Sequence, residues 1–463
     1  MTNVIIWPVF LKQFYNKKNM YMRELPKSNI LNCIRGDLFA WLMPLLFIIF
    51  SCREGMASDN AAHYGIMNAK DTSVSFFVNS YLENKDNVLR LYYPNTVKRF
   101  YGLNNQEAAW VKEKADPKQT WQAMLLLDCV LQYGLFHEDY HPKELLYDPL
   151  HDMLEVPGKI RNSQKARFDI LLTDALITLM NNLHYGKLNP AYNSNKIDSG
   201  MMVPFHAENA LLAARQQKDF MSAVTSVQPR SKLYAAMQDR MRQLKGVYQE
   251  DCYEVPESEV RKIAINMERL RWAEIDETTY IEVNIPSFTL KFYRPDTFYK
   301  FKVIVGAPAA PTPTFNSQII WVTTFPKWKI TDRSFSPIPH PGKLVFRFAD
   351  PGHVLMYESA DKRLFGHSER AAGNGNIRME NSDALVRLLL AYPGMGDKLR
   401  LFNKAMKGRL TRNISLAKPV PIKVTYITCE VHKGIVVSYK DIYNLDKGLE
   451  SALYNTTETL TLK

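Results

Sequence analysis

Thiols are the strongest candidate nucleophiles in this chain of 463 residues, and their spacing limits what they can do. The five cysteines are far apart, at Cys33, Cys52, Cys129, Cys252 and Cys429. None of them forms a CxxC motif or another spacing typical of metal ligands, so we predict no metal site and no cofactor. A disulfide between Cys129 and Cys252 stays open, because spacing alone does not fix a pairing. Cys429 shares a face of a predicted strand with Ile427 and Val431, which favours a buried core thiol over a nucleophile.

The segment 373–378 has the polar sequence Gly-Asn-Gly-Asn-Ile-Arg, and the resemblance given below draws attention to it. Asn374-Gly375 is a turn-forming dipeptide, so we expect a loop here. Asn374 and Asn376 carry no group that titrates near neutrality, so neither can act as a nucleophile or a base. The guanidinium of Arg378 suits a carboxylate ligand, although it could equally brace the loop.

Histidines and serines flank this segment. His353 and His367 are predicted to be surface positions without a ligand role, and Ser359 and Ser368 lack an obvious partner base. A new nucleophile among them is therefore the less favoured interpretation.

The N-terminal segment carries an export signal. Residues 39–50 form an unbroken apolar run, FAWLMPLLFIIF, preceded by basic residues. This run is too short to span a bilayer and suits the apolar region of a signal peptide. Its end, Ile49-Phe50-Ser51-Cys52, resembles the lipobox of bacterial lipoproteins, so we predict a signal segment 1–51, a lipid on Cys52 and a polar tether 52–70. A buried N-terminal helix is the alternative.

These features place the protein in the periplasm, anchored by lipid. Arg53 favours the outer over the inner membrane, because an acidic residue at that position signals inner-membrane retention.

Composition is that of a soluble globular protein with two domains. Hydrophobic residues make up 46% and charged residues 23%, and the net charge is +12. A basic surface attracts polyanions, but no zinc-finger spacing, RNP-like motif or basic helix supports nucleic acid as the partner.

The periodicity of apolar residues predicts a helical domain over 71–250. One helix starts at Asp116-Pro117 and stops at Gly134, and another starts at Ser163 and stops at Gly186. A third is expected near 206–225, and a fourth after Pro229.

Near residue 280 the apolar period changes from 3.6 to 2, which predicts strands. The expected strands include residues 281–292 as one continuing pattern, then 301–305, 320–324, 344–348 and 424–431. We therefore predict an α+β fold, with a linker over 251–278 and a mainly β domain with a C-terminal helix over 279–463.

Several segments together resemble one family. They are Phe168–Ala175 (FDILLTDA), Gly186–Pro190 (GKLNP), Gln228-Pro229 with Tyr234, Asn266–Trp272 (NMERLRW), Tyr280–Pro286 (YIEVNIP), Val305-Gly306, Thr312–Phe315 (TPTF), Phe325–Trp328 (FPKW), Pro419–Ile422 (PVPI), Asp441–Tyr443 (DIY) and Asp446. In this order they resemble the large periplasmic L,D-transpeptidases, which cross-link peptidoglycan and carry a helical scaffold domain. The resemblance implies the same two-domain fold over about residues 70–460.

The segment that matches the family's active-site signature, S-H-G-C-x-R, has lost its chemistry. The resemblance puts Gly373 at the serine, Asn374 at the histidine and Asn376 at the nucleophilic cysteine, and only Gly375 and Arg378 are kept. Tyr357 falls on a further histidine of the family. Loss of the nucleophile together with its base removes about six orders of magnitude in rate. The family's wall-binding insert is also missing, and residues 330–342 replace its lid, so a pseudoenzyme is indicated.

Three hypotheses for function follow. The favoured one is a lipoprotein that binds peptidoglycan stem peptides or a cell-wall synthesis protein in its β domain, with Arg378 and Tyr357 contacting the ligand. The second is a purely structural, partner-binding lipoprotein, and the third is an active acyl transferase with an unrecognised nucleophile.

Overall fold

The computed structural model describes residues 73–84, 89–112, 116–245, 258–272, 277–327, 341–350, 354–391 and 394–454. These residues belong to one compact unit, Lys70–Lys463. The expected signal segment 1–51, Cys52 and the tether 52–70 lie outside the described residues, as do Cys252 and His353. Within the described ranges, no helix combines the length and apolar character that crossing a membrane requires.

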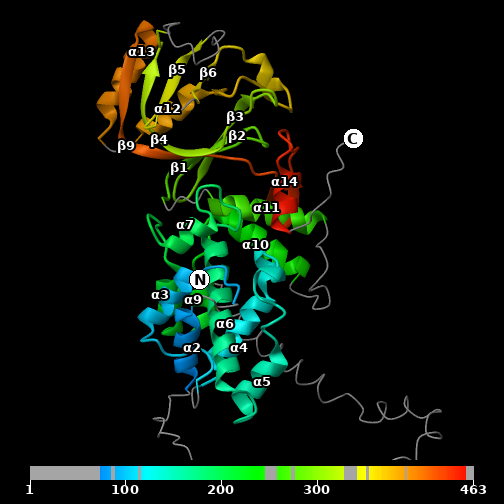
Figure 1. The fold of residues 1–463 in the computed structure, drawn as a ribbon. Coiled ribbons are helices and arrows are strands. Elements are labelled where there is room, and N and C mark those ends of the chain that lie inside the picture. Colours follow the sequence, from blue (N-terminus) through cyan, green and yellow to red (C-terminus); the bar gives the residue numbers. More distant parts are fainter. Residues whose placement is uncertain are drawn as a thin grey trace, which may run out of the picture. The chain divides into compact units, whose positions relative to one another are not determined.

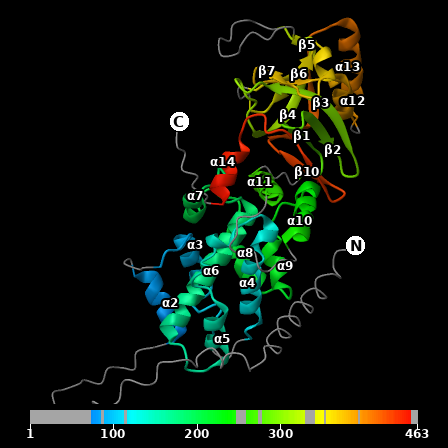
Figure 2. The ribbon, with the colours of Figure 1, turned by 90° about the vertical axis from the view of Figure 1, so that its right-hand side faces the viewer.

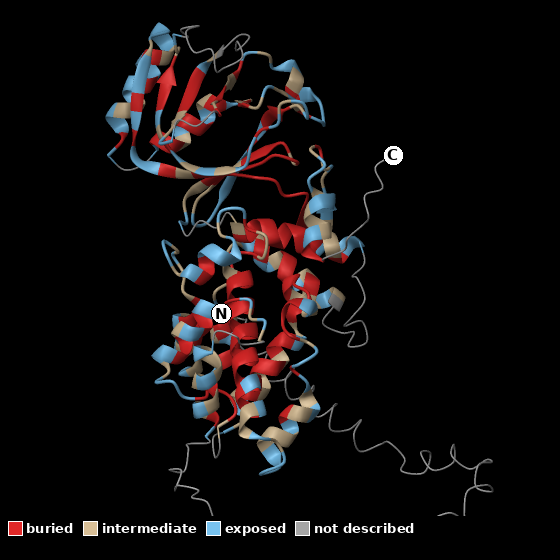
Figure 3. Cartoon of the chain, viewed as in Figure 1, coloured by how far each residue is buried: buried red, intermediate tan, exposed pale blue. Residues whose placement is uncertain are grey.

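The first half of the chain is helical, as predicted (Figure 1). Its elements are α2 (Val74–Glu83), α3 (Pro94–Leu103), α4 (Lys118–Asp128), η1 (Val130–Tyr133), η2 (His137–Asp139), α5 (Tyr147–Glu155), α6 (Asn162–His184), α7 (Ser194–Ser199), α8 (Ala207–Arg215), α9 (Phe220–Thr225), α10 (Lys232–Lys245) and α11 (Ser258–Trp272). α6 is buried on nearly all sides and forms the centre of this part (Figure 3). A helix buried all round needs partners for its polar residues as well as apolar packing.

Two carboxylates of α6 supply such contacts. Asp169 accepts hydrogen bonds from the backbone amides of residues 109–111 at 2.6 to 2.9 Å. Asp174 accepts from the amides of residues 92–93 at 2.9 Å. Both side chains are fully buried, and a buried carboxylate is tolerated only when it is paired or hydrogen-bonded. The FDILLTDA segment therefore holds the scaffold together.

The helix boundaries differ in part from the prediction. The single helix expected up to Gly134 is divided, because α4 ends at Asp128 and the 3-10 helix η1 follows it. Gly134 ends η1 in a left-handed conformation (φ 64°). α6 starts at Asn162 with Arg161 as its N-cap, so the predicted cap at Ser163 was wrong. The single helix expected near 206–225 is divided into α8 and α9. We attribute the break to Asp219, whose carboxylate accepts from the Ser222 amide and starts a new helix.

The predicted linker 251–278 needs a correction, because residues 258–272 form α11. α11 packs against α10, α14 and β10, and ten of its residues are buried. The sequence did not predict this helix, because we expected a helix with one apolar and one polar face. α11 is instead buried on several sides, and polar residues are among its buried positions.

The second half contains the strands and the remaining helices. They are β1 (Tyr280–Asn284), β2 (Thr289–Tyr293), β3 (Phe298–Gly306), β4 (Phe315–Thr324), β5 (Pro341–Phe348), β6 (Met356–Ser359), η3 (Arg363–Gly366), β7 (Ala371–Gly373), β8 (Ile377–Met379), α12 (Ser382–Leu390), α13 (Gly396–Gly408), β9 (Arg412–Thr425), β10 (Cys429–His432), β11 (Ile435–Ser438) and α14 (Asp446–Leu453). The α+β fold class is confirmed.

The main sheet has the order β2-β1-β9-β4-β5-β6-β8-β3-β7, and β2 also pairs with β3. The extra pairing returns the order to its start, so eight strands form a closed ring of hydrogen-bonded neighbours. One face of these strands packs with α12 and α13 into the main core, which includes Met356, Ile377 and Phe402. Figure 2 shows the two helices beside the strands. A ring without free edges gives the loops at its rim a fixed frame.

The expected continuous strand 281–292 is a hairpin. Its turn runs from Ile285 to Phe288, and the Phe288 amide donates to the Ile285 carbonyl at 3.1 Å. Phe288 has a positive φ of 53°, a conformation uncommon for a bulky residue. The apolar alternation hid the reversal because both strands turn their apolar residues to the same core.

Candidate functional site

The degenerate segment forms the loop between two short strands, β7 and β8. Gly373 ends β7 and pairs with Gly306 of β3, while Arg378 in β8 pairs with Ile304. Gly375 has a φ of 88°, which favours glycine over any other residue. The turn expected from Asn374-Gly375 is thus present, held on both sides by β3.

The two asparagines bond to each other. The Asn376 side-chain amide donates to Asn374 Oδ1 at 3.2 Å, and Asn376 Oδ1 accepts from the Leu355 amide at 2.8 Å. Asn376 is only 4% exposed, whereas Asn374 is exposed. Both polar groups of the Asn376 carboxamide are therefore engaged in bracing the loop.

Tyr357 and Arg378 lie side by side on neighbouring strands, because β6 and β8 are parallel and pair these two residues. The preceding pair, Met356 and Ile377, belongs to the core, so Tyr357 and Arg378 point to the opposite face. Asn376, directly before Ile377, is connected to the chain that enters β6, because its Oδ1 accepts from the Leu355 amide. The structure therefore brings Tyr357, Arg378 and the asparagine loop together, as the resemblance implied.

The electrostatics of this face favour a hydrogen-bond donor role. Burial raises the pKa of Tyr357, and the Arg378 guanidinium only partly opposes that rise, so the phenol keeps its proton at neutral pH. Arg378 donates from Nη2 to the Ala372 carbonyl at 2.8 Å. Its Nε is buried and has no hydrogen-bond partner among the described residues. Arg378 thus braces the loop, and its role as a ligand contact stays a prediction.

An unpredicted tyrosine contact supports the end of β3, which pairs with the start of the loop. Tyr443 donates its hydroxyl proton to the Gly306 carbonyl at 2.7 Å and accepts from the Thr312 amide at 3.1 Å. Thr312 Oγ1 in turn accepts from the Gly306 amide at 2.8 Å. A Cβ on Gly306 would overlap the Ala310 carbonyl oxygen, so only glycine fits. These residues belong to the quoted VG, TPTF and DIY segments, which was the available signal.

The other candidate nucleophiles are either buried or on the surface. Cys429 is fully buried, as predicted, and its burial raises the pKa of the thiol to about 12. It packs with α10 and α11, away from the main core of the sheet. Ser359 is buried and donates to the Asp361 carbonyl at 3.0 Å, and His367 and Ser368 are exposed. Among the described residues no group of three or more potential metal ligands occurs.

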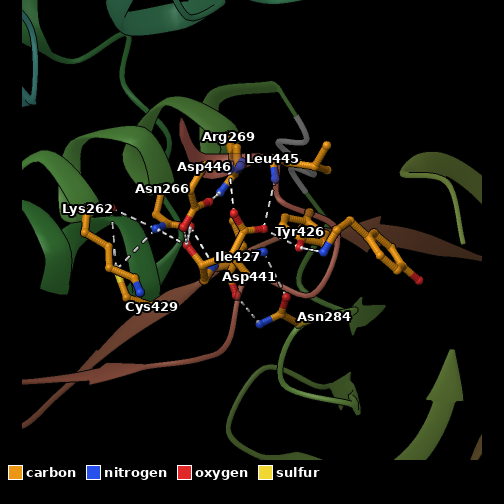
Figure 4. A network of polar contacts seen from close by, with 12 residues as sticks. Lys262, Asn266, Arg269, Asn284, Tyr426, Ile427, Cys429, Asp441, Leu445 and Asp446 are labelled. Carbon is orange, nitrogen blue, oxygen red and sulfur yellow. Dashed lines mark hydrogen bonds and ion pairs between the residues drawn. The ribbon is translucent and has the colours of Figure 1, made fainter. Parts of the chain in front are cut away.

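The NMERLRW segment, in α11, proves to be a junction between the two halves (Figure 4). Asn266 accepts from the Thr428 amide at 2.7 Å, and Arg269 pairs with Asp446 at 2.6 Å. The junction also reaches the scaffold. Glu268 accepts from the Leu188 amide at 2.7 Å.

A second arginine of α11 completes these scaffold contacts. Arg271 is fully buried, and it donates to the Tyr133 carbonyl at 2.5 Å and to the Tyr234 hydroxyl at 2.9 Å. The charged residues of this motif therefore connect α11 to both halves of the described chain.

Comparison with known families supports this organisation. Residues 95–241 match a family described as the Scaffold domain, and residues 278–394 match the L,D-transpeptidase catalytic domain. The second match includes Tyr357 and the whole segment from Gly373 to Arg378. The fold and the site thus define a scaffold domain joined to a domain of the L,D-transpeptidase type.

A curated relative agrees. A Haemophilus influenzae protein described as "Putative L,D-transpeptidase" is 24% identical over 247 residues, which cover 42% of this chain and 50% of that protein. The matched part thus spans about half the length of this relative.

Proposed function

We propose that this protein binds the peptide stems of peptidoglycan through Tyr357 and Arg378 and does not cross-link them. The observation that carries the proposal is the carboxamide pair, because Asn374 and Asn376 occupy the loop where the family has its base and its thiol. A carboxamide engaged in two hydrogen bonds has neither nucleophilicity nor a titrating proton.

The ligand chemistry follows from the remaining groups. The phenol of Tyr357 keeps its proton and is only 2% exposed, whereas the Arg378 guanidinium on the neighbouring strand is partly exposed. A carboxylate accepts charge-assisted hydrogen bonds from a guanidinium. Stem peptides end in a carboxylate, so the terminal D-amino acid is the group we assign to Arg378.

Attachment to a membrane is the second part of the proposal. The lipobox-like sequence before Cys52 supports a diacylated N-terminus in the periplasm, with the outer membrane favoured. Labelling of cells with an alkyne fatty acid should modify the natural protein but not Cys52→Ala, and equal labelling of the two would refute the anchor.

Calorimetry with a tetrapeptide stem tests the binding claim. We expect binding that weakens at least tenfold in Arg378→Gln, since a charge-assisted hydrogen bond contributes about 1.5–3 kcal/mol. Arg400→Gln is the matched control, because its side chain is 80% exposed on α13. Equal affinity in the two variants would contradict the proposal.

A further inference from the structure

A groove of about 1270 Å³ lies beside the junction, on the face of β1, β2 and β9 that points away from the main core. We call it the junction groove. Its lining comes from the sheet, including Tyr280, Glu282, Lys291 and Phe298, and from the scaffold segment 226–233. Sites for drug-sized ligands measure about 300–1,000 Å³, so this groove suits a longer ligand. Neither Tyr357 nor Arg378 lines it.

Paired charges form the sheet wall of the groove. Glu282 lies between Lys291 on β2 and Lys423 on β9 in the strand register. Lys423 pairs with Glu282 at 3.4 Å and Lys291 with Glu430 at 2.9 Å. These two carboxylates therefore balance these two ammonium groups, and the other charged residues that line the groove are Arg230, Lys232, Glu277, Arg294 and Asp296, which carry both signs.

A gain in stability does not explain why these ion pairs are buried. The side chains of Glu282, Lys423 and Glu430 are 3–6% exposed, and that of Lys291 is 12% exposed. Desolvating such pairs costs as much as their attraction returns, so apolar residues would hold these strands as well. An ion would have to compete with an existing partner, whereas a neutral polyhydroxyl ligand can bond to the pairs as they stand.

Aromatic rings accompany the charges. Tyr280 and Tyr293 stack at 4.7 Å, and the Tyr293 hydroxyl donates to Glu282 at 3.2 Å. Phe298 continues the row 5.7 Å from Tyr293 and is 53% exposed. On the scaffold wall Phe205 stacks on His184 at 4.2 Å. Aromatic rings beside polar groups suit a ligand with apolar faces and polar edges.

Hydrogen bonds connect the scaffold wall to α11. Gln228, at the start of this wall, accepts from the Tyr234 hydroxyl at 3.2 Å, and Tyr234 accepts from Arg271 of α11 at 2.9 Å. Residues 228–229 and Tyr234 form a segment that the peptide site leaves unexplained. Its role here is to hold the groove open at a set width.

We infer that the junction groove binds a neutral oligosaccharide several sugars long. Pyranose rings offer apolar C–H faces to Phe298 and the tyrosines, and hydroxyl edges to the Glu282 and Glu430 pairs. The inference goes beyond the proposed stem binding and does not depend on it. If both hold, the protein contacts the glycan and the peptide of one polymer at separate sites.

Calorimetry of the full chain with chitotetraose tests the inference. We expect Phe298→Ala to weaken binding roughly three- to tenfold, the range measured for aromatic contacts. Tyr299→Ala is the matched control, because Tyr299 is its neighbour on β3, is 36% exposed and does not line the groove. Arg378→Gln should bind the sugar as the natural protein does.

Four results would count against the inference. Absence of chitotetraose binding, or equal weakening by Phe298→Ala and Tyr299→Ala, would overturn it. Displacement of the sugar by a tetrapeptide stem would assign the groove to peptide instead. Chitotetraose affinity that disappears with added salt would contradict recognition of a neutral ligand by hydrogen bonds and ring contacts. Loss of peptide binding in Arg378→Gln with sugar binding intact would show that the two sites are independent.

Discussion

Replacing Asn266 by alanine should destabilise the protein by about 3 kcal/mol. Asn266 is fully buried in α11, and its carboxamide accepts from the Thr428 amide and donates to the Lys262 carbonyl, both at 2.7 Å. Each lost hydrogen bond costs about 1 kcal/mol, and the stranded Thr428 amide adds about 1–3 kcal/mol. Thr428 is fully buried, so water cannot replace the lost acceptor.

Thermal unfolding followed by circular dichroism measures this effect. At roughly 2–4 °C per kcal/mol, the melting temperature should fall by roughly 6–12 °C. Asn316→Ala is the control, because Asn316 is an exposed asparagine on β4 and should change stability by no more than about 0.5 kcal/mol. A melting temperature of Asn266→Ala within ~1 °C of that of the control would contradict the role of α11 as the junction.

Three further predictions concern single positions. Gly306→Ala should destabilise the site by about 2–3 kcal/mol in urea unfolding, because its Cβ meets the Ala310 carbonyl, and an unchanged midpoint would refute the close packing. Cys429 should resist iodoacetamide at pH 8, seen by peptide mass mapping, because burial raises the thiol pKa to about 12, so the reactive thiolate stays scarce until the pH approaches that value. Alkylation as fast as in urea would contradict this. Asp169→Asn should cost about 3–5 kcal/mol, since an amide group would face backbone donors, and a native melting temperature would argue against its role.

The periodicity of apolar residues predicted some helices and strands directly. A period of 3.6 residues predicted α6, and alternating apolar residues predicted β1. The turn at Phe288 was missed, because reversing the chain left its apolar face toward the same core. α11 was missed because its charged residues are buried, and their partners, such as Asp446, lie far along the chain.

The resemblance named the residues of the candidate site but not the contacts that hold them in place. The resemblance gave Tyr357, Arg378 and the asparagine loop, and the parallel pairing of β6 and β8 brings them together. The amide of Leu355 could not be predicted as the partner of Asn376, since a backbone donor leaves no mark in the sequence. Tyr443 belongs to a segment that the resemblance identified. The hydrogen bond from its hydroxyl to the Gly306 carbonyl could not be predicted, because it depends on the closed ring of strands.

Exchange of the terminal D-alanine of a tetrapeptide stem for a labelled D-amino acid tests the central claim most directly. The purified chain should produce no labelled peptide above the level of an Asn376→Ala variant, because the loop holds two hydrogen-bonded carboxamides and neither a thiol nor a base. Labelled peptide that forms with the natural protein and disappears with the variant would show that this loop still catalyses acyl transfer.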